Sequence, residues 1–432
     1  MPLPIRRFRR PVAADGRPHV VVLGGGFAGV SAVRELASLP VRVTLVDENP
    51  YSTFQPLLYQ VATGGLNPGD VIYPLRSLTA RTGNARVARG RVVGLDTDKR
   101  QLTLEHSRLN SDRTLTYDYL IVATGATTNF FGVPGAEEHA LPLYTRVDAL
   151  KVRDRVFGTL ERASAAHPPP SSLRFVVVGG GATGVEMAGA LAELRQAESV
   201  AFPELTNVET SVMLVEQVDH LLTAFVPKLR AYALRQLRNR GVQVRLNTPV
   251  KEVHADGVTV GSGDETERIR ADAVVWATGL KTDPVLDSWG LPRGRGGRIV
   301  VGPDLQVQGL SGVFAAGDVA VSSDPDRALP QLAQPAIQTG RHAVAQIARL
   351  LHGEPTTAFE YHDRGTMATI GRRAAVADIA HGPRLTGTLA WLAWLGLHLV
   401  TLLGGRNRAS ALVNMAARYA AWPGSINPII GD

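Results

Sequence analysis

The chain of 432 residues contains no cysteine. This absence excludes disulfide scaffolds, cysteine-ligated zinc, iron–sulfur clusters and redox-active dithiols. The sequence also lacks a zinc finger, a basic–aromatic RNA-binding signature and any long run of Lys and Arg, so we expect no nucleic-acid partner. We predict no metal site either. Any redox chemistry of this chain must therefore be carried by a bound organic cofactor.

What the chain does have is a basic balance of charge. Its 46 Lys and Arg against 39 Asp and Glu give a net charge of +7. Such a balance suits an anionic membrane surface or polyanionic ligands such as dinucleotides. The basic segment 1–10 is not followed by an apolar stretch, so we expect a tail rather than a signal peptide, with a weak membrane-touching arm as the alternative.

An internal duplication is the most informative feature. Residues 19–31 read HVVVLGGGFAGVS and residues 175–186 read FVVVGGGATGVE. Each copy is a β-branched run, a G-x-G-x-x-G turn and a helical stretch, followed later by a second buried strand that ends in an acid. The acids are Asp47 and Glu216. One such motif is weak evidence, but two in strand–turn–helix context predict two Rossmann units that bind dinucleotides.

Two further strands support a duplication of whole domains, since 119–125 and 273–279 both end in Ala-Thr-Gly. A later apolar strand ends in Gly317-Asp318. Alone, this pair would fit an ordinary strand–helix turn, but after two Rossmann units it indicates a carboxylate that accepts a hydrogen bond from the ribityl chain of a flavin nucleotide. We therefore predict FAD in the first unit and a nicotinamide cofactor in the second. The carboxylate of Glu216 favours NADH over NADPH, because it would repel a 2′-phosphate.

The residues that we predict to bind the cofactors are grouped by unit. They are Gly24, Gly26, Phe27, Ala28, Gly29, Asp47, Glu48, Val92, Thr124, Gly125 and Asp318 for FAD, and Gly179, Gly181, Gly184, Glu216 and Gly279 for NADH.

The predicted fold class is α/β, with two Rossmann-like domains and C-terminal membrane-associating helices. We expect a discontinuous FAD domain over 17–145 and 290–352, an NADH domain over 146–289, and a C-terminal region over 353–432.

The C-terminal region contains an uncharged stretch, Leu385–Leu403. At about 1.5 Å per residue it could just cross a bilayer core. However, it holds three Thr, two Gly and His398, and both of its Trp residues lie in its first half. We therefore expect an in-plane helix pair with Ala409–Trp422 at a membrane surface. A spanning helix and a buried core helix are the alternatives.

The chain resembles a known family, the type II NADH dehydrogenases, which are single-subunit, non-pumping NADH:quinone oxidoreductases. The resemblance covers about His19 to Trp422. It is carried by segments that are typical of the family: FQPLLYQVAT at 54–63, GATGVEMAG at 181–189, AQPAIQTG at 333–340, MATIGR at 367–372 and GTLAWLAW at 387–394. Two positions depart from it: Ser52 stands where many members have His, and no Lys follows Lys281.

The resemblance implies roles for individual residues. Ala333 and Gln334 would line the quinone-facing side of the flavin, and Gln334 and Gln338 would contact the quinone. Glu186 would be the catalytic glutamate. From its position alone, Glu186 could equally be an acid that the helix dipole stabilises, or a group that relays protons near the contact between nicotinamide and flavin.

The implied protein is a respiratory-chain flavoprotein that transfers a hydride from NADH to FAD and then two electrons to a membrane quinone. It would be peripheral, on the cytoplasmic face of the inner cell membrane, and a homodimer through the C-terminal region is compatible with the sequence. With no helical bundle and no further redox centre, we expect no proton pumping.

The same architecture serves other functions. Sulfide:quinone oxidoreductases and glutathione-reductase-like enzymes need redox cysteines, which this chain lacks. A reductase like those of ferredoxin or rubredoxin stays open, although such enzymes carry no apolar C-terminal anchor. An NADH-binding redox sensor, reduced once and then stalled, is the other alternative.

Overall fold

The computed structural model describes residues 16–105, 113–263 and 265–420. The predicted N-terminal tail and Trp422 lie outside the described residues. The chain forms two compact units. Unit 1 contains the described residues of Met1–Ser52, Tyr73–Thr127 and Leu280–Asp363, and unit 2 contains those of Thr53–Ile72, Thr128–Gly279 and Arg364–Asp432. The predicted assignment of one cofactor to each domain stays a prediction.

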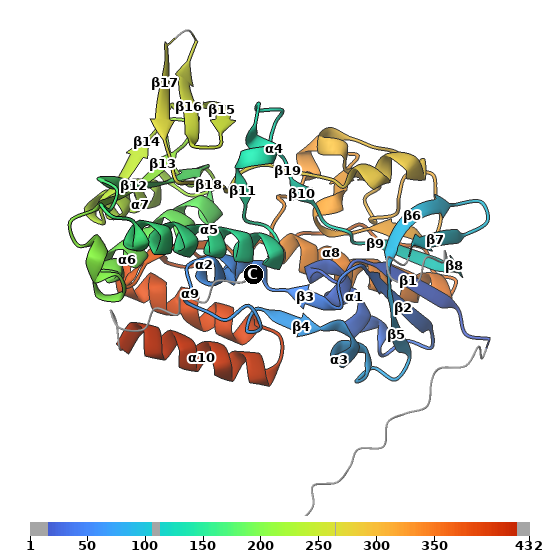
Figure 1. The fold of residues 1–432 in the computed structure, drawn as a ribbon. Coiled ribbons are helices and arrows are strands. Elements are labelled where there is room, and N and C mark those ends of the chain that lie inside the picture. Colours follow the sequence, from blue (N-terminus) through green and yellow to red (C-terminus); the bar gives the residue numbers. More distant parts are fainter. Residues whose placement is uncertain (1–15, 106–112, 264, 421–432) are drawn as a thin grey trace, which may run out of the picture. The chain divides into compact units, whose positions relative to one another are not determined.

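Unit 1 is built on a five-stranded parallel sheet in the order β21-β9-β1-β2-β5. The strands are β1 (His19–Leu23), β2 (Arg42–Asp47), β5 (Ala85–Arg89), β9 (Tyr119–Val122) and β21 (Val313–Ala315). Every residue of β1 is buried, as expected for a strand covered on both faces. Helices α1 (Phe27–Leu36) and α8 (Ala333–Leu351) pack on each other (Figure 1), and a Cβ on Gly340 would lie 2.3 Å from the carbonyl oxygen of Ala28.

Smaller elements complete unit 1. They are the antiparallel sheet β6 (Arg91–Asp96), β7 (Gln101–Glu105) and β8 (Arg113–Thr116), the parallel pair β20 (Ile299–Val301) and β22 (Ala320–Ser322), helix α3 (Leu75–Thr79), and the 3-10 helices η3 (Pro284–Trp289), η4 (Arg295–Gly297), η5 (Gly317–Val319) and η6 (Pro325–Arg327). Short strands occur where the chain passes from one unit to the other: β3 (Tyr51–Thr53), β4 (Ile72–Pro74), β10 (Thr127–Thr128) and β19 (Leu280–Lys281).

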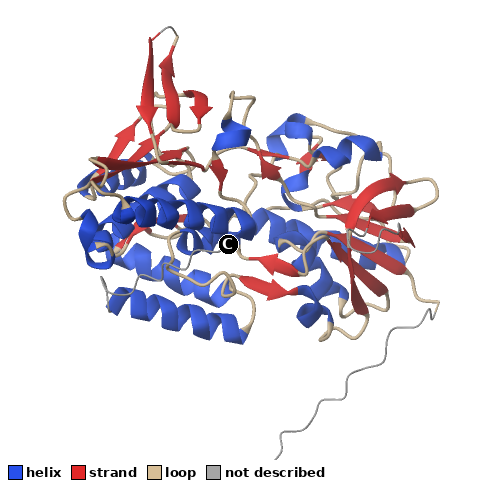
Figure 2. Ribbon diagram, viewed as in Figure 1, coloured by secondary structure: helices blue, strands red, loops and turns tan. Residues whose placement is uncertain are grey.

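Unit 2 repeats the parallel sheet, in the order β11-β18-β12-β13-β14. Its strands are β11 (Leu141–Pro142), β12 (Ser172–Val178), β13 (Glu209–Val215), β14 (Val242–Arg245) and β18 (Ala273–Trp276), and its helices include α2 (Leu58–Ala62), α4 (Ala136–His139), α5 (Arg146–Ala165), α6 (Ala182–Ala201) and α7 (Pro227–Asn239); η1 (Gln55–Leu57) and η2 (Pro203–Leu205) are 3-10 turns. Figure 2 shows an antiparallel sheet, β15 (Val250–His254), β16 (Gly257–Ser262) and β17 (Glu265–Arg270), extending from this unit.

From Arg364 onward, the described C-terminal residues belong to unit 2. The antiparallel sheet of β23 (Thr366–Gly371), β24 (Ala374–Asp378) and β25 (Arg384–Thr386) carries helix α9 (Gly387–Thr401), and α10 (Gly405–Ala420) lies beside α9 (Figure 1). The helix begins at Gly387 rather than Leu385, because residues 384–386 pair with β24. Within the described ranges, no helix combines the length and the apolar character that crossing a bilayer requires.

The predicted fold class is confirmed. Both copies of the duplicated motif form a parallel strand, a glycine turn and a helix. Asp47 is the last residue of β2, and Glu216 directly follows β13.

Two helix glycines give a matched test of packing in unit 2. A Cβ on Gly189 of α6 would lie 2.0 Å from the carbonyl oxygen of Ile370 in β23, whereas one on Gly158 of α5 would meet only the flexible end of Arg162, at 3.3 Å. We expect Gly189→Ala to lower stability by about 1–3 kcal/mol, as overpacked sites do. Gly158→Ala should leave stability unchanged or raise it by up to about 1 kcal/mol. Thermal unfolding of both variants checks this, and equal effects would contradict it.

Candidate functional site

The two glycine turns have the same geometry. Gly24 and Gly179 have φ of +100° and +106°, which favour glycine. A Cβ on Gly29 would lie 1.8 Å from the carbonyl oxygen of Gly24, and a Cβ on Gly184 would lie 1.8 Å from that of Gly179. No other residue fits these positions, because each helix starts in direct contact with its own turn.

The third glycine of each Gly-Gly-Gly run, Gly26 or Gly181, faces open space. A Cβ at Gly26 or Gly181 would meet no atom within 4 Å. Gly26 is the N-cap of α1, and Phe27 and Ala28 are the first residues of that helix. The free amides of a helix N-terminus attract phosphate. Both turns therefore have the room that a pyrophosphate needs, and the residues present fit a dinucleotide in each unit.

The acid of unit 1 is bound to its own glycine turn. Asp47 accepts hydrogen bonds from the backbone N–H of Gly25 and of Asn49, both at 2.6 Å. Burial raises the pKa of Asp47 to about 6, and these hydrogen bonds only partly oppose the effect. The carboxyl is thus ionised near neutral pH and lies at the carboxyl end of β2, the position expected for an acid that contacts a ribose.

Unit 2 repeats this arrangement. Glu216 accepts from the backbone N–H of Gly180 at 2.5 Å and of Val218 at 3.0 Å. Each carboxylate therefore accepts a hydrogen bond from the second glycine of the Gly-Gly-Gly run, Gly25 or Gly180. The two units thus share even this individual hydrogen bond.

The other predicted contacts of unit 1 gather at the same edge of the sheet. Parallel pairing places the carboxyl ends of β1, β9 and β21 side by side. A Cβ on Gly24 would lie 3.1 Å from the Cα of Thr124, the exposed residue just before Gly125. A Cβ on Gly317 would lie 3.2 Å from that of Ala28. The structure thus brings Asp318, which follows Gly317, next to the start of α1.

The N-terminus of α8 meets this edge as well. Ala333 and Gln334 are its first two residues, and five residues after Gln334 the Thr339 hydroxyl accepts from the N–H of Gly317 at 2.9 Å. Gln338 is engaged differently: its amide donates to the carbonyl of His362 at 2.9 Å and accepts from the N–H of His362 at 3.0 Å. Its predicted contact with a quinone stays a prediction.

Three predicted residues lie in other surroundings. Glu48 is exposed and forms an ion pair with Arg91 at 3.4 Å. Val92 is buried in β6, where it pairs with β7. Gly279 lies three residues after β18, where a Cβ would lie 2.4 Å from the ring of Phe131.

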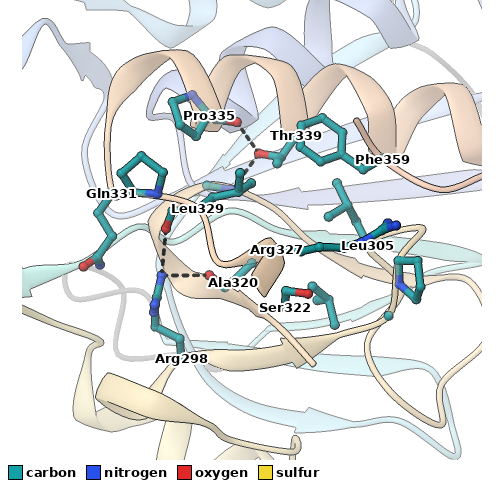
Figure 3. Close-up of a pocket in the computed structure, with 15 residues that line it drawn as sticks. Arg298, Leu305, Ala320, Ser322, Arg327, Leu329, Gln331, Pro335, Thr339 and Phe359 are labelled. Carbon is teal, nitrogen blue, oxygen red and sulfur yellow. Dashed lines mark hydrogen bonds between the residues drawn. The ribbon is translucent and has the colours of Figure 1, made fainter. Parts of the chain in front are cut away.

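A pocket in unit 1 lies beside η5 and the start of α8. Gly317, Gln331 and Pro335 line it, and Arg298 donates to the carbonyls of Ala320 and Leu329 at its edge (Figure 3). The pocket borders Asp318 and Gln334 along the chain without including either.

Glu186 is buried on α6, two residues after Gly184. Its carboxyl accepts from the backbone N–H of Thr369 in β23 at 3.3 Å and from the indole of Trp394 in α9. Burial raises the pKa of Glu186 to about 8. The carboxyl therefore holds a proton at neutral pH, and such a group can act as a general acid.

Aromatic rings surround this contact. The imidazole of His398 stacks on Trp394 with ring centroids 4.0 Å apart, and Phe54 meets His398 edge-on at 6.1 Å. Tyr59 is 6.1 Å from Trp394. In the sequence alone, the Trp and His residues of this helix bear only on whether the helix inserts into a membrane. The i, i+4 spacing of Trp394 and His398 was the available signal that one face of the helix is buried.

Titratable clusters elsewhere do not suggest a metal. The described ranges contain no group of three or more His, Asp or Glu side chains arranged to hold an ion. The chemistry that the described residues offer is thus two dinucleotide turns and one protonated buried carboxyl.

Glu186 should make stability depend on pH. The folded chain keeps this proton up to about pH 8, whereas the ordinary carboxyl value is 4.5, so stability falls as pH rises between these values. We expect Glu186→Gln to melt at a higher temperature than the unmodified protein, with a difference that grows from about pH 5 to pH 8 and is then constant. The exposed variant Glu161→Gln is the control and should show no such growth. A difference that is constant over the whole range would contradict the burial of an ionisable carboxyl.

Comparisons with known proteins agree with this geometry. The family model for pyridine nucleotide-disulphide oxidoreductases matches residues 18–340. Among curated proteins, the type II NADH:quinone oxidoreductase NdhA of Mycobacterium tuberculosis is 39% identical, with 93% of this chain and 87% of that protein covered. The enzyme Ndh of the same organism is 34% identical, with 95% and 90% covered. A type II NADH:quinone oxidoreductase of Staphylococcus haemolyticus is 30% identical, with 87% and 93% covered.

Solved structures show the same fold. NDH2 from Plasmodium falciparum in complex with NADH has a TM-score of 0.87 at 19% identity and covers 96% of this chain and 100% of that one. The sulfide:quinone oxidoreductase of Aquifex aeolicus reaches 0.73 at 18% identity, with 93% and 94% covered. Because the sequence matches extend over most of both partners, the chain belongs to the type II NADH:quinone oxidoreductases and is an NADH-dependent flavoprotein oxidoreductase.

Proposed function

We propose that the protein passes a hydride from NADH to bound FAD and then two electrons to a membrane quinone, without pumping protons. The observation that carries this proposal is Glu186. A carboxyl that keeps its proton at neutral pH is hydrogen-bonded to α9, and the outer face of that helix is apolar and exposed. A proton donor that is hydrogen-bonded to a helix with an exposed apolar face suits the reduction of a lipid-soluble acceptor.

FAD fits unit 1 better than a smaller flavin would, because the chain offers a contact for each part of it. The turn at Gly24–Gly29 would hold the pyrophosphate, Asp47 the adenosine ribose and Asp318 the ribityl chain. Ala333 and Gln334 would border the ring system. FAD, when bound, supplies hydride acceptance and electron transfer, while the protein supplies orientation.

NADH would occupy unit 2. Gly179, Gly181 and Gly184 form its turn, and the carboxylate of Glu216 would accept from the adenosine ribose 2′-hydroxyl, which NADPH carries as a phosphate ester. Gly279 lies three residues after β18, as Gly125 lies three residues after β9 in unit 1.

The proton balance gives Glu186 its role. The overall reaction is NADH + H⁺ + quinone → NAD⁺ + quinol, so one proton must come from outside the hydride. Glu186 would donate that proton and regain one from water. Gln334, at the N-terminus of α8, would orient the quinone.

The membrane contact would use the outer faces of α9 and α10. Leu389 and Val400 of α9 are each 68% exposed, and Val413 of α10 is 64% exposed. Leu392, Leu397 and Leu412 are exposed on the same two helices. Isolated apolar side chains are normal at a surface, but six on two adjacent helices suit insertion into the acyl boundary of a cytoplasmic leaflet.

The nicotinamide preference can be tested at Glu216. Glu216→Ser with Gln217→Arg removes a repulsive carboxylate and supplies a phosphate partner. We expect the ratio of kcat/KM for NADH to that for NADPH to fall at least tenfold, roughly the effect of one charge-assisted hydrogen bond. Gln217→Arg alone is the control and should retain most of the preference. An unmodified enzyme that uses both cofactors equally would refute the assigned role of Glu216.

The quinone proposal can be tested on the exposed face of α9. Leu389→Glu with Val400→Glu should leave NADH oxidation by a water-soluble acceptor within about twofold, since neither side chain is buried. The pair should leave the membrane fraction and lose at least tenfold of its activity with a long-chain quinone in vesicles, because each apolar side chain contributes about 1.5–3 kcal/mol when fully buried.

Val147→Glu, an exposed apolar position on α5, is the matched control and should keep both activities. Flavin reduction by NADH without turnover by any quinone would favour a redox sensor. Turnover only with a protein acceptor would favour a reductase of the ferredoxin type.

A further inference from the structure

The indole of Trp394 in α9 lies in the interior of unit 2. Trp394 is 1% exposed and is the largest of the fully buried side chains. Its indole donates to the carboxyl of Glu186, which lies on the second Rossmann helix. The helix proposed to touch the membrane thus also touches the proposed proton donor.

The geometry leaves the indole little freedom. The His398 ring stacks on it at an interplanar angle of 23°, and the Nδ1 of His398 lies 2.6 Å from the carbonyl oxygen of Trp394. The ring of Tyr59 in α2 also lies beside the indole, with the ring centroids 6.1 Å apart and an interplanar angle of 59°. A ring held on two sides points its N–H in one direction.

The chemistry of this bond has a fixed sense. An indole nitrogen can only donate, so it bonds a carboxylate oxygen more strongly than a protonated carboxyl. The backbone N–H of Thr369, which also donates to Glu186, likewise favours the ionised carboxylate. Burial opposes both, since it disfavours the charged form. The indole therefore lowers the free energy of releasing a proton that burial would otherwise retain.

Other titratable groups near the cluster do not share this role. Burial lowers the pKa of His398 to about 4, so this ring is neutral over the range in which Glu186 titrates. Strand β23 contributes no titratable side chain, since it reads TMATIG. Tyr59 faces the indole from α2, and Glu193, further along α6, accepts from the N–H of Arg372.

We propose that Trp394 is a positioning residue for the proton step: its indole N–H orients the Glu186 carboxyl and favours its ionised form, so that α9 controls proton release. This inference rests on the proposed function in taking Glu186 as the proton donor.

The first experiment measures the proton on Glu186 without any substrate. The infrared carbonyl band of the protonated carboxyl, assigned by its loss in Glu186→Gln, is titrated in the oxidised, flavin-bound protein. In Trp394→Phe, which keeps an aromatic ring but has no N–H, the midpoint should rise by about one pH unit, a tenfold tighter hold on the proton. Trp391→Phe, a buried indole one turn earlier on α9, is the matched control and should leave the midpoint unchanged.

A second measurement needs no change at Trp394. The indole band that reports N–H hydrogen bonding in ultraviolet resonance Raman spectra should titrate in the unmodified protein with the same midpoint as the carbonyl band. It should not titrate in Glu186→Gln. This test decides the question even if Trp394→Phe fails to retain its flavin.

The outcomes separate the two proposals. An unchanged carbonyl midpoint in Trp394→Phe, or an indole band that ignores pH, overturns the role of Trp394. A shifted midpoint with an unchanged pH profile of quinone reduction supports the role of Trp394 and instead overturns Glu186 as the donor. A shift of both by the same amount supports both proposals.

Discussion

Both units depend on one steric contact, the approach of a helix to the strand that precedes it. A Cβ at Gly29 or Gly184 would fall 1.8 Å from a backbone oxygen, so glycine alone permits the helix to start there. That close start directs the helix N-terminus at the open space beside Gly26 or Gly181. The parallel sheets then bring the remaining strand ends to the same edge. The cofactor sites follow from this contact, because helix, turn and acid all take their positions from it.

A second constraint acts on Glu186. Its burial makes the charged form unfavourable, and the two hydrogen-bond donors that it receives only partly compensate. The same α9 that supplies one of these donors exposes Leu389 and Val400 on its other face. One helix therefore has two tasks that cannot be changed independently. Perturbed carboxyl groups cluster at functional sites because a catalytic acid needs a pKa matched to its task.

The sequence predicted much of this arrangement because its main signals are local. A glycine turn between a β-branched strand and a helix needs no distant information, and the acids Asp47 and Glu216 lie at the end of the next strand of each unit. The neighbours of Glu186 could not be predicted in the same way. Thr369 and Trp394 lie about 180 and 210 residues further along, and the bond to Thr369 uses a backbone N–H that every residue type carries. The hydropathy of α9 also does not indicate that Trp394 and His398 face inward, because both sides of the helix are apolar.

The bonds from Asp47 and Glu216 to the turn amides have a consequence for ligand affinity. Glycine is the residue with the most backbone freedom, and three of them in a row would fluctuate widely if left alone. Here the carboxylate fixes the second glycine of each turn while the site is being formed. The loss of conformational entropy is therefore incurred during folding rather than when a dinucleotide arrives, and rigid sites of this kind bind more tightly for the same contacts. An acid known for recognising a ribose thus also acts as a preorganising clamp on the loop that receives the phosphates.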